Sequence, residues 1–380
     1  MTRRHPRVVI VQERLPHYRV PFFKGLRDHL AREEIELQVL HGHSHGVVAA
    51  RHDEGHLDWA QVVTNRIFTA RGVSLVHQPV LRRTSSADLV VVEQASRMLV
   101  NYLLLVRQGF SGAPVAFWGH GGGVQGNDLM RTRASEAVKG HVSRLPHWWF
   151  AYTEGSARRV ERLGFDPRRI TVVQNSVDTS FMKTVSADRN SARCIYVGSL
   201  DERKRLDLVF QAADELAARR ADFHLVVVGD GPLRPQVSSM AGARTHVSYV
   251  GPRFGEDLAR ELKSASVMLM PGAVGLGVLD AFAAGLPVVT ANGPGHGPEL
   301  EYLREGWNAA IVEATPRSLA AATADLMDPT RRVQLERACA ETSERISMEE
   351  MVARFASGVT QALRLRAART AENRTESVAG

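Results

Sequence analysis

Short apolar runs alternate with segments of helical periodicity along almost the whole chain. In the first half, runs rich in Val, Ile and Leu lie at 7–11, 37–40, 88–93, 115–118, 148–152 and 170–173. In the second half, similar runs lie at 194–197, 224–228, 246–249, 267–270, 288–290 and 309–312. Continuous apolar strands that alternate with helices are typical of parallel sheets covered on both faces. The pattern therefore predicts an α/β protein with two doubly wound domains.

The polar segment 175–193 lacks periodicity, and we interpret it as the linker between these domains. The N-terminal domain then spans 1–180, and the C-terminal domain spans 190–345. Helical periodicity continues beyond this point, and we expect 346–369 to form a helix that packs back on the N-terminal domain. The small-residue, polar segment 370–380 is expected to be a disordered tail. The apolar segment 98–106 is interpreted as a buried helix, not a membrane insert.

Composition limits the class of protein. The 380 residues suffice for two cores, and an apolar content of 44% with 23% charged residues is ordinary for a soluble globular protein. The sequence shows no signal peptide and no apolar run that could span a bilayer. Cys194 and Cys339 lie far apart without metal or redox spacing, so we expect a cytoplasmic protein in a reducing compartment.

The formal charge of +7 would suit nucleic acid, anionic lipid or a phosphorylated substrate. Only five of the 48 basic residues are Lys, which indicates a coding bias toward Arg and weakens charge as a guide to function. Because the sequence has no stripes of basic and aromatic residues, we expect no nucleic-acid partner. Peripheral contact with the anionic inner face of a membrane stays open.

Polar and glycine residues cluster where the predicted strands end. In open α/β sheets, ligands bind at the loops that leave the carboxyl ends of the strands. The two rows of loops are expected to face each other across a cleft, as in a binding site. In the C-terminal domain the segments are 197–205, 229–232, 251–253 and 271–289, and in the N-terminal domain they are 15–19, 93–94, 119–123 and 153–154.

The glycine-rich loop after the strand 267–270 is the most informative of these segments. A helix is expected to open near Leu276, with Asp280 in its first turns. Unpaired backbone N–H groups at such a helix start favour a phosphate, and an acid one turn further on suits a ribose hydroxyl. Lys204, one of few lysines, follows a Gly turn at another strand end, which favours diphosphate binding over a solvated helix start. Together these features indicate a nucleotide-sugar site.

These motifs resemble the retaining glycosyltransferases of family 4, whose GT-B fold has two Rossmann-like domains facing across a cleft. The resemblance covers nearly the whole chain and is densest over 194–312. It implies that Arg203 and Lys204 grip the donor diphosphate, and it makes these two residues and His120 the catalytic candidates. The implied acceptor site comprises His17, Tyr18, Arg19, Glu93 and His120. The implied donor site comprises Gly198, Ser199, Arg203, Lys204, Gly229, Asp230, Gly231, Gly251, Gly272, Gly275, Leu276, Gly277, Asp280 and Glu299.

Three positions depart from the family's pattern. The first of its two signature glutamates, which touches donor-sugar hydroxyls, is Gly272 here, and Asp280 replaces the second. The usual Arg of the turn after the strand 194–197 is Ser199. Either the chain holds its sugar differently or it has lost activity, and we interpret the change at Gly272 as a subfamily trait. The segments 17–23 and 118–121 resemble relatives that build polysaccharides and glycolipids.

Several residues have a second interpretation that the sequence leaves open. His120 can contact the donor sugar or the acceptor, or it can be a loop histidine packed under Trp118. The segment 17–19 can form part of the acceptor site or simply the start of a helix. The tract 119–123 is similar to an esterase oxyanion loop, but no Gly-x-Ser-x-Gly elbow accompanies it. Four histidines and one glutamate invite comparison with a metal site, but their spacing fits no compact set of ligands. We therefore expect no metal at His41, His43, His45, Glu54 and His56.

The predicted function is hexosyl transfer from a nucleoside-diphosphate sugar to a glycan, lipid-linked or small-molecule acceptor. The resemblance implies retention of the anomeric configuration, no metal and no cofactor. It also implies a same-face displacement in which the departing phosphate helps to deprotonate the acceptor. Two alternatives share the architecture: a non-hydrolysing sugar-nucleotide epimerase, and a catalytically silent GT-B binding partner, which Gly272 would suit.

Overall fold

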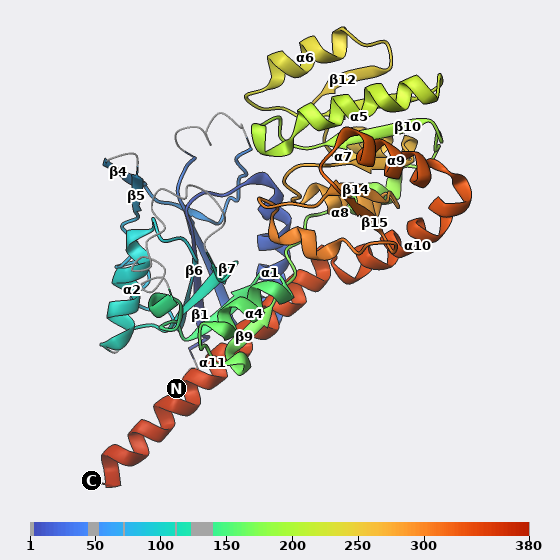
Figure 1. Cartoon of the computed structure of the whole chain (residues 1–380). Coiled ribbons are helices and arrows are strands. Elements are labelled where there is room, and N and C mark those ends of the chain that lie inside the picture. The colour runs from blue at the N-terminus through green and yellow to red at the C-terminus, as the bar shows by residue number, and fades with distance from the viewer. Residues whose placement is uncertain (1–3, 45–52, 71–72, 111, 123–139, 380) are drawn as a thin grey trace. The chain divides into compact units, whose positions relative to one another are not determined.

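The computed structural model describes residues 4–44, 53–70, 73–110, 112–122 and 140–379. These residues form two compact units (Figure 1). The N-terminal unit contains the described residues up to Gln174 together with those from Met348 onward, and the C-terminal unit contains 175–347. Each unit has a parallel sheet covered by helices, which confirms the predicted α/β class.

The sheet of the N-terminal unit has seven parallel strands in the order β3-β2-β1-β6-β7-β8-β9. The chain order reverses between β1 and β6, so the carboxyl ends of these neighbours form a topological switch point, where open α/β sheets bind ligands. A separate antiparallel pair is formed by β4 and β5. The strands are β1 (Arg7–Gln12), β2 (Glu36–His41), β3 (Gln61–Val62), β4 (Arg66–Ala70), β5 (Val73–His77), β6 (Leu89–Glu93), β7 (Val115–Gly119), β8 (Trp148–Ala151) and β9 (Ile170–Val172).

Side chains alternate between two cores along the strands of this sheet, as the strand period of two requires. Val8 and Ile10 of β1 join the core that contains residues of α1 and α11. Val9 and Val11 join the core that contains residues of α2 and α4. Each large apolar side chain buried in this way contributes about 1.5–3 kcal/mol. The helices are α1 (Val20–Arg32), α2 (Leu99–Gly109), α4 (Glu154–Arg162) and α11 (Met348–Ala379).

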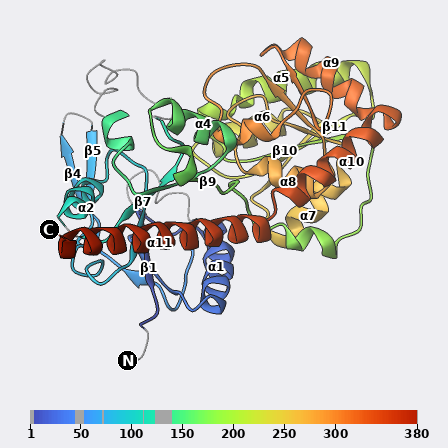
Figure 2. The same ribbon diagram turned by 90° about the horizontal axis from the view of Figure 1, so that it is seen from below.

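Helix α11 belongs to the N-terminal unit although it is last in the sequence, and it lies beside α1 (Figure 2). Phe355 is fully buried and stacks on Phe150 of β8, with ring centroids 4.1 Å apart and an interplanar angle of 6°. Met351 and Val359, one turn to either side, are also buried. The helix continues to Ala379, into the segment that was expected from the sequence to be a disordered tail. Ala, Arg and Glu in that segment favour extension of a helix that the core has already nucleated.

Helix α2 is apolar on two faces, and the core covers one of them. Val100 and Leu104 are buried against the sheet, whereas Leu103 and Val106 are 43% and 62% exposed. The expectation that 98–106 is a buried helix is therefore wrong for the second face, because hydropathy alone does not say which face is covered. Within the described residues, no helix has the length and apolar content needed to cross a bilayer.

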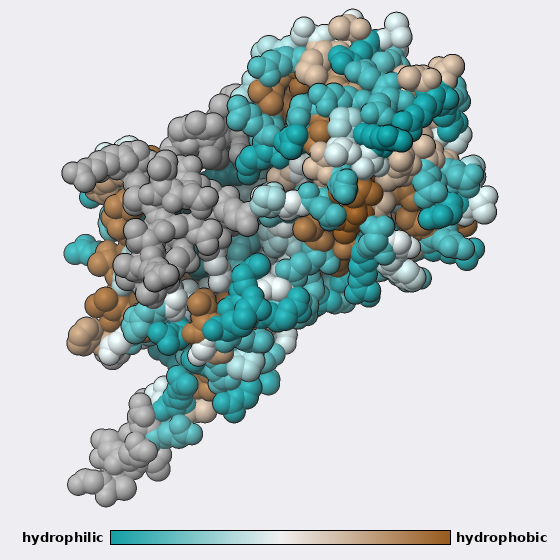
Figure 3. All heavy atoms as spheres, in the orientation of Figure 1, coloured by the Kyte–Doolittle hydropathy of each residue, from teal (hydrophilic) through white to brown (hydrophobic). Residues whose placement is uncertain are grey.

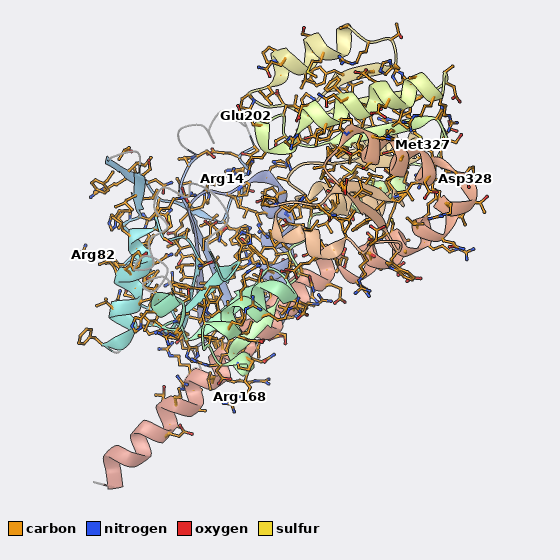
Figure 4. The ribbon with its side chains drawn as sticks, in the orientation of Figure 1. Arg14, Arg82, Arg168, Glu202, Met327 and Asp328 are labelled. Atoms are coloured by element: carbon orange, nitrogen blue, oxygen red, sulfur yellow. The ribbon has the colours of Figure 1, made fainter. Side chains whose placement is uncertain are left out.

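The sheet of the C-terminal unit has six parallel strands in the order β12-β11-β10-β13-β14-β15. The chain order reverses between β10 and β13, so the loops after these two strands flank the switch point. The strands are β10 (Arg193–Val197), β11 (His224–Val228), β12 (Val247–Gly251), β13 (Val267–Leu269), β14 (Val288–Ala291) and β15 (Ala309–Val312). The helices are α5 (Leu206–Arg219), α6 (Arg234–Gly242), α7 (Gly255–Ser264), α8 (Gly277–Ala283), α9 (Pro316–Met327) and α10 (Pro329–Arg345). Figure 4 labels Met327 and Asp328, where α9 gives way to α10.

The predicted linker lies within the C-terminal unit, so the division between the units falls after Gln174 and not within 180–190. Asn175 is buried, and its side-chain amide donates to Glu299 Oε1 at 2.9 Å. The carbonyl of Asn175 accepts from the Tyr302 hydroxyl at 3.1 Å. The segment lacks periodicity because specific polar bonds, not one repeating apolar face, attach it to the unit.

Candidate functional site

The loops after β10 and β13 meet at the switch point of the C-terminal sheet. Ala273 donates its backbone N–H to Arg203 O at 2.8 Å, and Lys204 Nζ donates to Ala273 O at 2.5 Å. Lys204 Nζ also lies 3.7 Å from the position that a Cβ on Gly275 would occupy. The structure therefore brings the predicted cation and the predicted glycine loop together. An ammonium group beside a glycine loop is a favourable setting for a phosphate.

Two glycines allow these loops to approach each other closely. A Cβ on Gly272 would lie 2.3 Å from Lys204 C and 2.4 Å from Arg203 O, both backbone atoms. A Cβ on Gly229, whose φ is +147°, would lie 1.8 Å from Gly198 O. These distances are far below van der Waals contact, so a side chain at either position would displace the neighbouring backbone. The packing of the loop thus gives a physical reason for glycine at 272, where the family has glutamate.

Arg203 is held by an acid that the sequence analysis does not single out. Its guanidinium donates to Asp201 at 2.9 and 3.2 Å, and Ser199 Oγ donates to the same carboxylate at 2.9 Å. Burial opposes ionisation of Asp201, but the bonds from Arg203 and Ser199 outweigh it and lower the pKa. Ser199, at the position of the family's Arg, therefore orients Asp201, and Asp201 orients Arg203. Glu202, labelled in Figure 4, lies between Asp201 and Arg203 and begins the helical turn Glu202–Lys204.

The other predicted donor residues lie mainly at the carboxyl ends of neighbouring strands. Gly229 donates its backbone N–H to Gly251 O at 3.1 Å, and Asp230 O accepts the N–H of Leu200 at 2.9 Å. The structure therefore brings the loops after β10, β11 and β12 together. Glu299 is an exception: its side chain is only 5% exposed, and its carboxylate accepts a hydrogen bond from the Asn175 amide. Gly231 lies directly after Asp230, and Leu276 and Gly277 open α8 as predicted.

Asp280 lies in the first turn of α8, at the position that the sequence analysis assigns to ribose binding. Burial and, next in size, the charge of Asp178 raise the pKa of Asp280 to about 7. The residue keeps part of its surface exposed. At neutral pH its carboxyl populates both protonation states and can donate to, or accept from, a hydroxyl group. Asp178 carries no motif and is missed by the sequence analysis.

His296 joins the loop after β14 to the glycine loop and was not predicted from the sequence. Its Nδ1 accepts the Val274 N–H at 3.2 Å, and the Gly297 N–H donates to Val274 O at 2.9 Å. Burial lowers the pKa of His296, a backbone bond to Ala291 opposes the shift, and the charge of Lys204 adds to it. His296 is therefore neutral at pH 7 and positions Val274. A His within a Gly- and Pro-rich run at a strand end is the signal that could have found it.

A cavity of about 110 Å³ lies at the switch point of the N-terminal sheet. Tyr18, Arg19 and Glu93 of the predicted acceptor site line it. Burial, followed by the charge of Glu13, raises the pKa of Glu93 to about 7, while Arg19 and Arg97 limit the shift. Glu13 accepts from Arg97 Nε at 2.9 Å. The cavity is therefore lined by two acids and three arginines.

Three further charged residues of the lining were missed, although two of them directly follow β1. Glu13 and Arg14 come after the last residue of that strand, and Arg97 follows β6. Arg14, labelled in Figure 4, pairs with Asp53 at 2.6 Å. Polar residues immediately past a strand end are the signal that would have found them.

The two predicted histidines have different surroundings. Neither lines the cavity. The backbone N–H of His17 donates to Asp53 O at 2.8 Å, an arrangement that suits the start of a helix. His120 packs edge-on against Tyr152 with ring centroids 4.5 Å apart. Its Nδ1 is buried and has no hydrogen-bond partner among the described residues. Burial, then Arg159 and Arg19, lowers the pKa of His120 to about 4, so the ring is neutral at physiological pH.

The polar cluster near His41 pairs internally. His43 Nδ1 lies 3.3 Å from Glu54, and His56 lies 2.9 Å from Asp58. Over the described ranges, no three His, Cys, Asp or Glu side chains are grouped to hold a metal ion. His45 and the last residue of the tract 119–123 lie outside the described residues.

Comparison with known proteins finds a family similarity within the C-terminal unit. Residues 191–329 match the family described as glycosyl transferases group 1. The D-inositol 3-phosphate glycosyltransferase of Rhodococcus opacus is 28% identical over 209 residues, which cover 46% of each chain. A GDP-mannose-dependent alpha-(1-6)-phosphatidylinositol monomannoside mannosyltransferase of Mycolicibacterium smegmatis is 30% identical over 220 residues, 54% of this chain and 56% of that one. The chain thus spans about half the length of the curated relatives it matches.

The similarity to solved structures extends over both units. The Anabaena protein HepE, solved in complex with UDP and glucose, has a TM-score of 0.63 and 14% identity. The match covers 93% of this chain and 99% of that one. At this identity the likeness concerns the fold. Residues 191–329 are thus similar to the group 1 glycosyl transferases, and the chain has the GT-B fold of two Rossmann-like domains.

Proposed function

We propose that the protein is a retaining glycosyltransferase that moves a sugar from a nucleoside-diphosphate sugar to a glycan, lipid-linked or small-molecule acceptor. It would use no metal and no cofactor. The observation that carries the proposal is the position of the Lys204 ammonium, fixed beside Gly275 at the switch point of the C-terminal sheet. The names of the relatives, which are glycosyltransferases and mannosyltransferases, support the reaction class. The UDP in the HepE structure supports a nucleotide-sugar donor.

In this proposal, Lys204 stabilises the negative charge that develops on the diphosphate as the sugar leaves. Arg203, oriented by Asp201, supplies a second cation. Such electrostatic stabilisation usually contributes more to catalysis than any other single effect. Asp280 would bind the ribose, and the loops after β11 and β12 would surround the base.

The acceptor would bind in the cavity at the N-terminal switch point. Glu93, whose pKa is raised to about 7, can accept a hydrogen bond from an acceptor hydroxyl or donate one to it. His120, which is neutral, packs against the lining residue Tyr152 and lies beside the cavity, not in its lining. The departing phosphate would take the acceptor proton, so neither side chain needs to act as a strong base.

A thermal-shift panel of UDP, GDP, TDP and their sugars tests the donor site. A ligand that binds only the folded state raises the melting temperature by mass action. The stabilising sugar nucleotide is then incubated with candidate acceptors, and products are identified by mass spectrometry. Conversion without acceptor would indicate the epimerase, and binding without any product would indicate the silent partner. If no nucleotide stabilises the protein, the donor site is wrong.

The buried carboxyl of Asp280 predicts a pH-dependent effect on stability. The pKa of Asp280 rises from its ordinary value of 3.8 to about 7 in the folded state, so the native protein binds the extra proton between these values. Its contribution to stability is therefore present at low pH and is lost as pH rises toward 7. Asp280→Asn should melt at a higher temperature than the wild type at pH 8, with a smaller difference at pH 5.

Asp222→Asn is the control for that measurement. Hydrogen bonds from Arg220 lower the pKa of Asp222, so removal of its charge should not stabilise the protein at pH 8. Equal melting temperatures for Asp280→Asn and the wild type at both pH values would show that burial does not raise the pKa of Asp280.

A further inference from the structure

Helix α2 presents an aligned set of exposed apolar side chains. Leu103 and Val106 lie one turn apart on the same side of the helix, and Phe110 follows directly as its C-cap. They are 43%, 62% and 81% exposed. Scattered exposed apolar residues are ordinary, but an aligned set of this size marks an interaction surface. Figure 3 shows hydrophobic atoms at the surface of the N-terminal unit where α2 lies in Figure 1.

Cations lie beside this set. Arg107, near the end of α2, donates to Leu81 O at 2.6 Å and thereby attaches the turn 81–86 to the last turn of the helix. Arg82 and Arg83 of that turn are exposed. Figure 4 shows Arg82 beside α2. The guanidinium of Arg82 forms no hydrogen bond or ion pair within the described part of the chain, so its charge is available to a partner.

Acids are scarce in the same part of the sequence. Residues 59–112 contain six Arg and only two acids, Asp88 and Glu93. Asp88 already pairs with Arg4 and Arg366, and Glu93 lines the cavity described above. We define the α2 face as Leu103, Val106, Phe110, Arg82 and Arg83. It combines a line of apolar side chains with positive charge that acids leave uncompensated.

We infer that the α2 face docks on the surface of an anionic lipid membrane. Apolar side chains of a helix lying in the interface enter the boundary between headgroups and acyl chains, while nearby cations contact anionic headgroups. The charge complementarity favours a lipid surface over a second copy of this chain, since two such faces would repel each other through Arg82 and Arg83. This docking is independent of the proposed reaction.

Vesicle flotation with the full-length chain tests the inference. Vesicles of phosphatidylcholine are compared with vesicles that contain phosphatidylcholine and phosphatidylglycerol in equal amounts. The wild type should bind the anionic vesicles and be released by high salt. Arg82→Gln with Arg83→Gln should weaken that binding roughly tenfold or more, as two lost headgroup contacts predict. Val106→Ser with Phe110→Ser should weaken it roughly tenfold or more through lost apolar burial.

Val333→Ser is the matched control for the apolar pair. Val333 lies on α10 and is 46% exposed, so its replacement removes a similar exposed side chain outside the α2 face. It should bind vesicles as the wild type does, and melting curves check that all variants fold. Equal binding of the wild type to both vesicle types, or wild-type binding by Val106→Ser with Phe110→Ser, would overturn the inference. So would a wild-type dimer that this pair of changes converts to a monomer without any vesicle binding.

The thermal shift with nucleotides separates this test from that of the donor site. The α2 variants should keep the wild-type response to the stabilising nucleotide, because the donor loops lie in the C-terminal unit. A chain that binds nucleotide but not vesicles would refute only the membrane inference. A chain that binds vesicles but no nucleotide would refute only the proposed function.

Discussion

Replacement of Lys204 by alanine is expected to lower kcat/KM by a hundredfold or more with any nucleoside-diphosphate sugar that serves as donor. The leaving diphosphate carries more negative charge in the transition state than in the bound substrate, and a fixed ammonium stabilises that difference. A hundredfold loss corresponds to roughly 2.7 kcal/mol. That value lies within the ~1.5–3 kcal/mol of a hydrogen bond to a charged group. Steady-state kinetics of the purified variant and the wild type measure this loss of kcat/KM.

Lys263→Ala is the matched control for this variant. Lys263 also lies in the C-terminal unit, and its ammonium also donates to a backbone carbonyl, that of Val185. The change removes the same kind of bond away from the donor loops, so kinetics close to the wild type are expected. Lys204→Arg should retain part of the activity, because it keeps the charge but not the compact shape. Unchanged kinetics in Lys204→Ala, or an equal loss in Lys263→Ala, would contradict the donor site.

The sequence was sufficient to place Lys204 and Gly275 at one edge of a sheet. Apolar runs at 194–197 and 267–270 predict two buried strands, which the structure contains as β10 and β13. In a parallel sheet every carboxyl end lies at the same edge, so the loops that follow such strands are neighbours by topology. The hydropathy of the strands alone therefore predicts which loops are neighbours, without any knowledge of side-chain contacts.

Contacts between loops could not be predicted in this way. The bond from Val274 to His296 and the proximity of Asp178 to Asp280 depend on how loops pack after the sheet has formed. The same holds for the close approach of Gly272 to the backbone of Lys204, since a glycine in a sequence does not reveal what lies beside it. Exposure of the second face of α2 also depends on tertiary packing, because its apolar residues resemble core residues in the sequence.

The second large effect is expected at Gly272. Gly272→Ala should lower kcat/KM tenfold or more, and Gly272→Glu, which restores the family's residue, should lower it at least as much. A Cβ at this position would lie 2.3 Å from Lys204 C, so the backbone that presents the ammonium must move. Misplacement of a catalytic group by about 1 Å can cost roughly a hundredfold. Kinetics and the nucleotide-induced thermal shift measure the loss.

Gly242→Ala shows whether such a loss comes from the loop or from a general effect of removing glycine. Gly242 ends α6 in the same unit, and a Cβ there would meet nothing within 4 Å. Alanine at that position should leave kinetics unchanged and stability equal or slightly higher. If Gly272→Glu instead gains activity, the loop can relax around a side chain, and its close packing does not explain the missing glutamate. If it loses activity while the unliganded protein melts normally, the glycine is what allows Lys204 to reach the diphosphate.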